Sequence, residues 1–439
     1  MRTASDLCLQ DAFEHTQPSQ SLNVVFVTLA DLPEGGGSTS RLKMLAKATS
    51  ECGHKVTLLN EHASGCAPTQ VLKAAGNIGK VEYKYILGSV NRKFGLQSIG
   101  FKLRVVSALA KEIRTRHAAK KIDLLWFNHL SFYDTYPLTR LSQSLGIPTI
   151  QSYEDERFQK AFKMRSPSST IFSVNAYLAD CYCPRRADAV IVISRYLEQK
   201  YAARVRDRSK LHIVPTIVDC DYWDVGPEPA SAVPVLLYAG TFSEQDEIEN
   251  VLVALTLLRS RGRSFRLIAL GANRDPRHAG KLSSKIRDLH LGDVLELRGF
   301  VGLDEVKREV ASSNILLNVR RDSLWSRSGL STKMSEYLAA GRAVVCTDLG
   351  DVSMYVKHGQ SAMLVPPTTT AEEIAAAIDL LLVSPELRQK IGRAGKEVAA
   401  KYFGLRAACD KIEKIIRSAV SSSEVIGSQA MMNQQTENA

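Results

Sequence analysis

The stretch NVVFVTLADLPEGGGSTSRLKMLAKATSECGHKVTLL, residues 23–59, decides the fold class of this 439-residue chain. It begins with an apolar run typical of a buried strand, and residues 54–59 form a second such run. Between them lie a glycine-rich loop and the segment RLKMLAKATSECG, which has the amphipathic pattern of a helix. A strand, a helix and a second strand in this order predict a parallel sheet with helices on its faces.

The same alternation of strand and helix recurs along the chain and starts again after residue 234. Further strands are predicted in the first half at residues 122–127, 147–153 and 188–194. A second set is predicted at residues 235–240, 265–270, 294–299, 314–319, 343–347 and 362–366, with helices between them. The predicted fold is therefore α/β, with two Rossmann-like doubly wound domains that face each other across a cleft.

The segment between the two halves is rich in proline, small residues and acids, which is typical of a linker. The predicted divisions are a disordered tail at 1–20, a first Rossmann-like domain at 21–218, a linker at 219–234, a second Rossmann-like domain at 235–403, a C-terminal helix at 404–420 that packs back on the first domain, and a disordered tail at 421–439. Ligands of such folds bind at the carboxyl ends of the strands, so a site is expected in the cleft between the domains.

Composition and charge narrow the classes of function. With 45% hydrophobic and 23% charged residues the chain resembles ordinary globular proteins, and no apolar stretch is long enough to predict a membrane span. The N-terminal residues lack the apolar core of a secretion signal, and the eight cysteines form no zinc pattern, so a cytoplasmic protein with reduced thiols is expected. The net charge of +11 favours an anionic partner.

The sequence SRSGLSTKMSEYLAAG, residues 326–341, predicts a helix start that binds an anion such as a diphosphate. The first amides of a helix are unpaired and lie at the positive end of its dipole. Gly329 lets a ligand approach the backbone closely, and Lys333 adds a positive charge. Glu336, on the next turn, is spaced to accept hydrogen bonds from ribose hydroxyls. The alternative is a capped surface helix with an ion pair between Lys333 and Glu336.

The segment STKMSEYLAAGRAVVCTDLGDVSMYVKHGQSAMLVPP, residues 331–367, resembles the donor-site segment of glycosyltransferase family 4, in the form found in a bacterial surface-polysaccharide subgroup. Other pieces that resemble the family follow in the expected order: EGGG at 34–37, GHKVTLL at 53–59, ADAVIVISRYL at 187–197, VPTIVDCDYW at 214–223 and LRGFVGLDEVKREVASSNILLNV at 297–319. The resemblance implies the GT-B architecture and a retaining transfer of a sugar from a nucleotide diphosphate sugar.

The resemblance also implies roles for individual residues in binding this donor. Glu336 would bind the ribose, and backbone amides at the helix start would hold the diphosphate or the sugar. A loop after the strand at 294–299 would frame the base, and the first glycine loop would approach the donor from across the cleft. The implied donor-binding residues besides Glu336 are Gly35, Gly36, Gly37, Gly240, Gly299, Phe300, Val301, Arg320, Arg327, Gly329, Leu330, Ser331 and Lys333.

Three residues are candidates for the catalytic centre. His129 falls near the active-site histidine of the family, with Asn128 as the alternative, and would steady the charge that grows at the anomeric carbon. Glu154, in an acidic run that follows a strand, would orient the acceptor hydroxyl, unless the run is simply solvated. Ser328 falls where the family has its first glutamate, so a hydroxyl replaces a carboxylate beside the donor sugar.

A second departure from the family concerns the charge that holds the diphosphate. Gln245 and Asp246 stand where the family usually has two basic residues. The candidates to supply positive charge instead are Arg320, Arg321, Arg327 and Lys333, and a solvated basic loop is the alternative. No metal site is predicted, because the Asp-x-Asp pattern of Asp219 and Asp221 lies beside the linker, where a structural role is favoured.

The resemblance thus implies a metal-independent, retaining hexosyltransferase that needs no cofactor besides its nucleotide sugar donor and acts on a glycan or lipid-linked glycan acceptor. It also implies that the first domain lies on the acceptor side and that the second domain binds the nucleotide sugar. A basic stretch at 73–121 predicts contact with an anionic membrane surface at the inner face of the cell membrane, and a core-facing helix with a charged outer face is the alternative. Binding of nucleic acid is not predicted. A nucleotide-sugar 2-epimerase and a catalytically silent donor-binding or partner subunit stay open as other functions.

Overall fold

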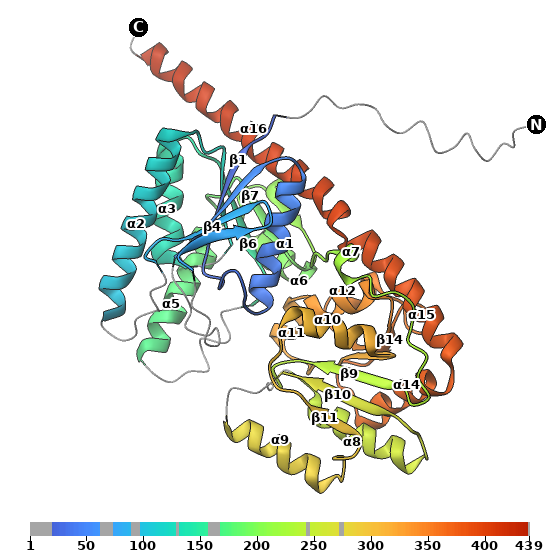
Figure 1. The fold of residues 1–439 in the computed structure, drawn as a ribbon. Coiled ribbons are helices and arrows are strands. Elements are labelled where there is room, and N and C mark those ends of the chain that lie inside the picture. Colours follow the sequence, from blue (N-terminus) through green and yellow to red (C-terminus); the bar gives the residue numbers. More distant parts are fainter. Residues whose placement is uncertain are drawn as a thin grey trace, which may run out of the picture.

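The computed structural model describes residues 20–61, 73–88, 97–128, 131–156, 167–242, 246–271 and 276–437. It has two α/β domains, each built on one largely parallel sheet, and Figure 1 shows them stacked with the long helix α16 (Leu405–Glu437) along one side. The fold class predicted from the sequence is confirmed. No helix in the described ranges combines the length and the apolar character that crossing a membrane requires.

The first domain contains an eight-stranded sheet in the order β3-β4-β2-β1-β5-β6-β7-β8, in which only the β3–β4 pair is antiparallel. Its strands are β1 (Asn23–Thr28), β2 (Lys55–Asn60), β3 (Ala75–Ile78), β4 (Val81–Tyr85), β5 (Leu124–Phe127), β6 (Thr149–Tyr153), β7 (Ala189–Val192) and β8 (Leu211–Ile213). Its helices are α1 (Gly37–Glu51), α2 (Gln97–Ala119), α3 (Phe132–Ser144), α5 (Pro167–Tyr182), α6 (Arg195–Ala202) and the short η1 (Arg208–Lys210).

Strand β1 lies inside this sheet because its residues are apolar on both faces. Val24 is opposite Val56 of β2 on one side and Leu124 of β5 on the other. One face of the sheet packs on α1 and α16, and the other packs on α2 and α3. Both faces are therefore covered, which explains why the strands read as continuous apolar runs in the sequence.

The second domain contains a six-stranded parallel sheet in the order β11-β10-β9-β12-β13-β14. Its strands are β9 (Val235–Ala239), β10 (Arg266–Leu270), β11 (Leu295–Leu297), β12 (Ile315–Asn318), β13 (Ala343–Thr347) and β14 (Met363–Val365). Its helices are α8 (Ile248–Ser260), α9 (Pro276–Asp288), α10 (Leu303–Ser312), α11 (Leu324–Ser328), α12 (Thr332–Ala339), α13 (Val352–Tyr355), α14 (Ala371–Val383) and α15 (Pro385–Val398), followed by the π-helical turn η2 (Ala399–Phe403).

The chain crosses between the domains twice, once at Val218 and once at Gly404, and these two crossing segments meet. Val218 forms a parallel bridge with Gly404, and its amide donates to the carbonyl of Phe403 at 2.8 Å. The segment after the first crossing forms the short helix α7 (Cys220–Trp223) and continues to β9. Farther along this segment the buried Arg342 donates to the carbonyls of Gly226 and Pro227 at 2.9 Å each. The predicted linker is thus ordered and attached to the second domain.

After the second crossing, α16 returns to the first domain. Ala408, Ile412 and Ile416 of this helix are buried in the same core as β1 and α1. The prediction of a disordered tail at 421–439 is wrong for residues 421–437, because α16 continues to Glu437. A helix that is already formed extends at little cost through residues with ordinary helix propensity, although they lack an apolar face. The tail predicted at 1–20 lies, apart from its last residue, outside the described residues.

Candidate functional site

The loop after β12 leads through α11 to the start of α12, the helix predicted to bind an anion. Ser331 occupies the N-cap position, but its hydroxyl donates to Asn318 Oδ1 at 3.2 Å and makes no cap hydrogen bond with the helix. Gly329 is half-buried beside it, and Leu330 is buried among residues of both domains. Within the described part of the chain, the first amides of α12 therefore have no side-chain cap.

Lys333, the second residue of α12, reaches the carboxyl end of β9. Its Nζ donates to the carbonyl of Ala239 at 2.7 Å. Burial lowers the pKa of this ammonium, whereas the carboxylate of Asp246 acts in the opposite direction. A Cβ at Gly240 would lie 3.4 Å from Lys333 Nζ. The lysine and the glycine that the sequence implied for donor binding are therefore neighbours at the end of the sheet.

Arg320 follows β12 and belongs to the same group of charges. It is half-buried, and burial lowers the pKa of its guanidinium while Asp246 raises it. Its backbone forms an isolated bridge with Asp246, which holds the carboxylate near both cations. Asp246 thus contributes a negative charge where the family usually has a positive one. The neighbouring Gln245 lies outside the described residues.

The other two arginines of this loop are held by carboxylates. Exposed Arg327 forms a fork with Asp322, in which Nε and Nη2 donate to the two carboxylate oxygens at 2.5 Å each. Arg321 Nε donates to Glu247 at 2.9 Å. The alternative of a solvated basic loop therefore fits these two residues, whereas Arg320 and Lys333 lie on the half-buried side of the loop.

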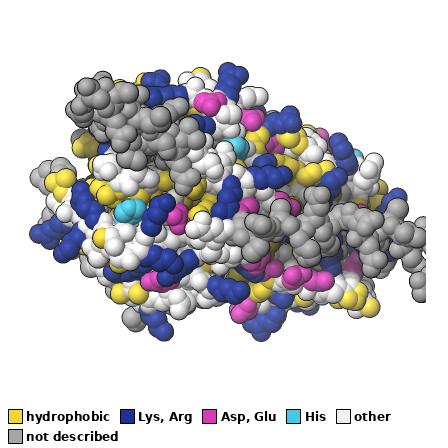
Figure 2. Space-filling view, turned by 90° about the horizontal axis from the view of Figure 1, so that it is seen from above, with side chains coloured by type: hydrophobic (Ala, Val, Ile, Leu, Met, Phe, Trp, Pro, Cys, Tyr) yellow, Lys and Arg dark blue, Asp and Glu magenta, His cyan; other side chains and the backbone are white. Residues whose placement is uncertain are grey.

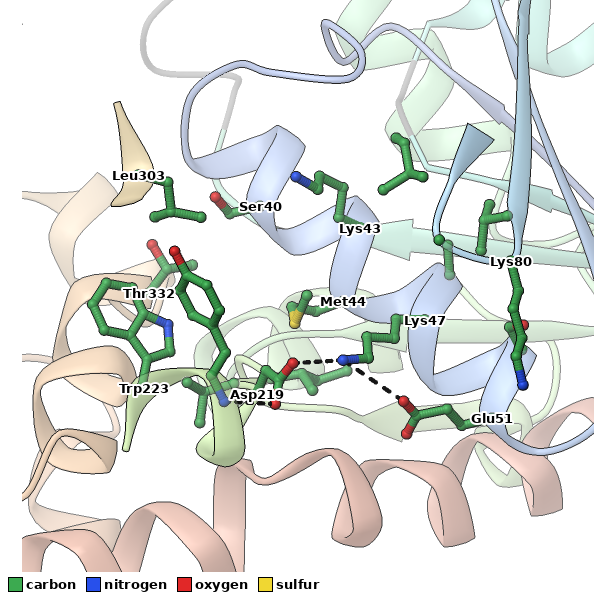
Figure 3. A pocket seen from close by; sticks show the side chains of 18 of the residues that line it. Ser40, Lys43, Met44, Lys47, Glu51, Lys80, Asp219, Trp223, Leu303 and Thr332 are labelled. Carbon is green, nitrogen blue, oxygen red and sulfur yellow. Dashed lines mark hydrogen bonds and ion pairs between the residues drawn. The ribbon is translucent and has the colours of Figure 1, made fainter. Parts of the chain in front are cut away.

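Glu336 lies one turn farther along α12, on the wall of a cavity of about 450 Å³ between the domains (Figure 3). Burial raises the pKa of its carboxyl from the ordinary value of 4.5 to about 7, and the ammonium of Lys333 opposes the shift. Thr332 lines the same cavity. The carboxyl group thus faces a space that suits a nucleoside, and the assignment of Glu336 to the ribose stays a prediction.

Three glycines come together at the carboxyl ends of β9, β10 and β11. Gly271 N donates to the carbonyl of Gly299 at 2.5 Å, and a Cβ at Gly271 would lie 1.7 Å from the carbonyl oxygen of Gly240. Gly271 has a φ of +119°, so only glycine fits here. Gly271 was not among the predicted site residues, although a glycine directly after a predicted strand was a usable signal. In the predicted base loop, Phe300 is 70% exposed and Val301 is half-buried.

The first glycine loop precedes α1 and lies opposite the start of α12. Gly36 occupies the N-cap position of α1, and a Cβ at Gly37 would lie 3.9 Å from Thr332 Oγ1. A Cβ at Gly35 would lie 2.2 Å from Thr39 Oγ1, so this residue has to be small. The structure therefore brings the predicted loop of one domain to the predicted helix start of the other.

Glu154 follows β6 in the cleft, and the sequence reasoning missed one of its partners. Asn128 Nδ2 donates to Glu154 Oε1 at 2.9 Å, whereas His129 lies outside the described residues. The buried Arg41 of α1 lies 3.8 Å from the same carboxylate, and burial lowers the pKa of its guanidinium to about 10. A usable signal was the spacing of four and seven residues from Leu45 and Ala48, which puts Arg41 on the apolar face of the predicted helix.

Ser328 is fully buried at the contact between the domains. Its hydroxyl donates to the carbonyl of Trp325 and accepts from the amide of Glu156, both at 3.1 Å. Its own carbonyl accepts from the Ser194 hydroxyl at 2.5 Å. Both hydrogen-bonding functions of the hydroxyl are thus used within the protein. This geometry favours a role in joining the domains, and contact of Ser328 with the donor sugar stays a prediction.

Comparison with known proteins assigns the family. Residues 35–222 match the family model described as Glycosyltransferase Family 4, and residues 233–384 match the model described as Glycosyl transferases group 1. The two matches together span most of both domains. The chain belongs to glycosyltransferase family 4. This glycosyltransferase is similar to the alpha-D-kanosaminyltransferase of Streptomyces kanamyceticus, with 22% identity over 63% of this chain and 72% of that relative.

Solved structures similar to this glycosyltransferase have the GT-B fold. Sucrose-phosphate synthase from Thermosynechococcus elongatus superposes with a TM-score of 0.70 at 14% identity, over 91% of this chain and 100% of that one. Anabaena HepE in complex with UDP and glucose superposes with a TM-score of 0.65 at 14% identity, over 90% of this chain and 100% of that one. The two-domain architecture implied by the sequence is therefore confirmed.

The Asp-x-Asp pattern of the glycosyltransferase has a structural surrounding. Asp219 Oδ2 pairs with Lys47 at 2.5 Å, and Asp219 Oδ1 accepts from the amide of Tyr222 at the start of α7. Among the described residues, no three His, Cys, Asp or Glu side chains are grouped to hold a metal ion. Asp219 therefore joins α1 to the crossing segment.

Helix α2 of the glycosyltransferase contains most of the basic stretch, and its apolar side faces inward. Val105, Leu109 and Ile113 are buried in the first domain, as the core-facing alternative predicted. The outer side exposes Arg104 and, with 67% of its surface accessible, Leu103. In the view of Figure 2, Lys and Arg side chains are spread over the coloured part of the surface, where no single patch collects them.

The raised pKa of Glu336 gives an expected pH dependence. A carboxylate accepts two ribose hydroxyls better than a neutral acid does, so ligand binding favours the ionised form. With a pKa of about 7 in the free protein, affinity for a nucleotide diphosphate sugar is expected to rise about tenfold between about pH 6 and pH 8. Such a donor suits the measurement by calorimetry because its diphosphate diester does not titrate in that range.

The matching control is Glu336→Gln, whose affinity should be at least about tenfold lower at the higher pH and independent of pH. The stability of the unliganded protein changes with pH in the opposite direction. The pKa of Glu336 is higher in the folded than in the unfolded protein, so the free energy of unfolding falls as pH rises from about 4.5 to 7. A pH profile of the wild type that matches that of Glu336→Gln would exclude the ribose assignment.

Proposed function

We propose that this family 4 protein is a retaining, metal-independent glycosyltransferase that moves a sugar from a nucleotide diphosphate sugar to a glycan or a lipid-linked glycan. The observation that carries the proposal is the arrangement at the start of α12. There, amides without a side-chain cap adjoin Lys333, and Glu336 faces the cavity between the domains. UDP-glucose is a natural first donor to test, because a structure of similar fold, Anabaena HepE, was solved in complex with it.

The charge of the leaving diphosphate would be balanced by groups of the protein. The start of α12 supplies the positive end of a helix dipole, and Lys333 and Arg320 add two cations at the same edge of the sheet. Asp246 offsets part of that charge in the free protein. These groups would act without a metal ion. Each would stabilise the negative charge that develops on the departing diphosphate in the transition state more than it stabilises the bound donor.

Retention would follow from attack on the same face of the sugar that the diphosphate leaves. The acceptor hydroxyl forms the new bond to the anomeric carbon, the bond to the diphosphate breaks, and the departing phosphate oxygen takes the acceptor proton. Glu154 would orient the acceptor, since it lies where the first domain meets the loop between α11 and α12: a Cβ at Gly329 would be 3.5 Å from the backbone carbonyl oxygen of Glu154. His129, next to Asn128 in the chain, keeps its proposed role of steadying the sugar.

The acceptor is proposed to be reached from the cytoplasmic side, with the protein at the inner face of the cell membrane. The exposed cations of α2, which include Arg104, Lys111 and Arg114, support contact with anionic lipid. The exposed Leu103 directly precedes Arg104 and would add an apolar contact with the membrane. Binding to vesicles with and without anionic lipid tests this part, and equal binding to both would exclude it.

The function is tested by incubating the protein with isotope-labelled nucleotide sugars and membrane extracts. Label in a lipid or glycan fraction, with the anomeric configuration of the donor and unchanged by a chelator, is the expected result. A new nucleotide sugar formed without acceptor would indicate an epimerase instead. Tight binding of nucleotide without turnover on any acceptor would indicate a silent donor-binding subunit, which the engaged hydroxyl of Ser328 would then explain.

A further inference from the structure

The cavity between the domains extends along one side of α1. Ser40, Lys43 and Met44 of this helix face Leu303 and Trp223 across it, and Lys80 lies at the end farthest from Leu303 (Figure 3). Thr332 and Glu336 line the cavity from α12. Both domains therefore line the cavity, and a nucleoside within it would contact side chains of each.

The proposed function fixes which part of a nucleotide lies here. If the diphosphate is at the start of α12 and the ribose is at Glu336, the base would lie in the same cavity, at Leu303, which follows the predicted base loop 299–301 in the chain. Leu303 gives that base an apolar surface, because 48% of this leucine is accessible although it lines the cavity. Ser40 and Lys43 then provide polar groups on the opposite side.

Lys43 differs from the next lysine on the same face of α1. Lys47 is paired with Asp219 at 2.5 Å and lies 3.7 Å from Glu51. The half-buried ammonium of Lys43 has no ion pair or hydrogen bond within the part of the chain that the structure describes. An ammonium is a donor only and gains most from an acceptor in a partly desolvated place. The first domain thus offers an unused donor to whatever fills the cavity.

We propose that Lys43 determines the specificity for the donor base by donating a hydrogen bond to a carbonyl oxygen of that base. The carbonyl in question is O4 of uracil or O6 of guanine, because cytosine and adenine carry an amino group at the corresponding position, and an ammonium cannot accept a hydrogen bond from it. Lys43 therefore favours uridine or guanosine diphosphate sugars over those of cytidine or adenosine. The inference rests on the proposed function and deepens it, because it places base selection on the domain opposite to the one that holds the phosphates.

The test compares the affinities of UDP, GDP, CDP and ADP for the wild type, Lys43→Met and Lys80→Met by calorimetry. The wild type is expected to prefer UDP or GDP by at least about tenfold, and Lys43→Met is expected to lose that preference while its affinity for CDP and ADP changes less than about twofold. Lys80→Met is the matched control, a second cavity lysine at the far end, and should leave all four affinities within about twofold. Which of UDP and GDP binds more tightly identifies the base.

A second variant, Lys43→Gln, keeps a polar group of similar reach that can both donate and accept, and should narrow the preference without abolishing it. An equal loss of affinity for all four nucleotides in Lys43→Met would mean that the lysine only attracts the diphosphate, and would overturn the inference. So would a wild-type preference for ADP or CDP, or a preference that survives in Lys43→Met. Failure of the wild type to bind any nucleotide would instead overturn the proposed function on which the inference rests.

Discussion

Replacement of Lys333 by methionine is expected to weaken binding of UDP-glucose about 100-fold. The methionine keeps most of the length of the side chain but removes a half-buried cation, and a hydrogen bond to a charged group contributes up to about 3 kcal/mol. The loss should appear in the dissociation constant measured by calorimetry. The melting temperature of the unliganded variant, measured in parallel, reports what the lost bond to Ala239 does to the fold.

Arg327→Met provides the matched control for this experiment, because it removes a cation from the same loop. The fork with Asp322 and the exposure of Arg327 predict a change in affinity of less than about twofold. If Arg327→Met weakened binding as much as Lys333→Met did, the diphosphate would be bound by the outer loop, and the assignment of the site to the half-buried side would be wrong.

Replacement of Arg342 by methionine is expected to lower the free energy of unfolding by about 3–5 kcal/mol. Arg342 is 2% exposed and donates to the carbonyls of Gly226 and Pro227 in the crossing segment. It also donates to the carbonyls of Ser313 and Ala311 at 3.0 Å each. Methionine fills much of the same space but leaves these buried acceptors without a donor. Denaturation by urea, followed by circular dichroism, measures the loss.

The control for Arg342 is Arg266→Met, on the edge of β10 in the same domain. Arg266 is exposed and forms an ion pair with Glu296, in which Nη2 and Oε2 are 3.4 Å apart. The free energy of unfolding of Arg266→Met is therefore expected to change by less than about 0.5 kcal/mol. If Arg342→Met also changed the free energy of unfolding by less than about 0.5 kcal/mol, water would have to replace the guanidinium at the carbonyls.

The sheets could be predicted from the sequence because their strands are buried on both faces. The strand at 343–347 was predicted with the bounds that the structure has, and the strand at 235–240 differs by one residue. The hairpin of β3 and β4 was missed. Residues 81–85 alternate in burial, and β3 is a four-residue strand at the edge of the sheet with no buried residue, so the apolar run that marked other strands is absent.

The candidate site was predictable where one segment carries it, and less so where distant segments meet. Lys333 and Glu336 were identified from their spacing on one helix. The contacts of Ser328 and Arg41 could not be predicted in this way, because their partners are remote in the chain. The amide of Glu156 donates to Ser328 from 172 residues away, and Arg41 donates to the carbonyl of Val214 from 173 residues away. No local pattern reports such pairs, because the packing of two domains creates them.

The bridge between Val218 and Gly404 makes the two crossing segments a single pivot. Both segments are fastened at the same point, so the domains can swing about it but cannot slide apart there. The cavity is lined in part by the first crossing segment, through Ile217, Val218 and Asp219, so the pivot forms one of its walls. A molecule that fills the cavity must therefore bias the angle between the domains, and the angle in turn must set how tightly that molecule is held.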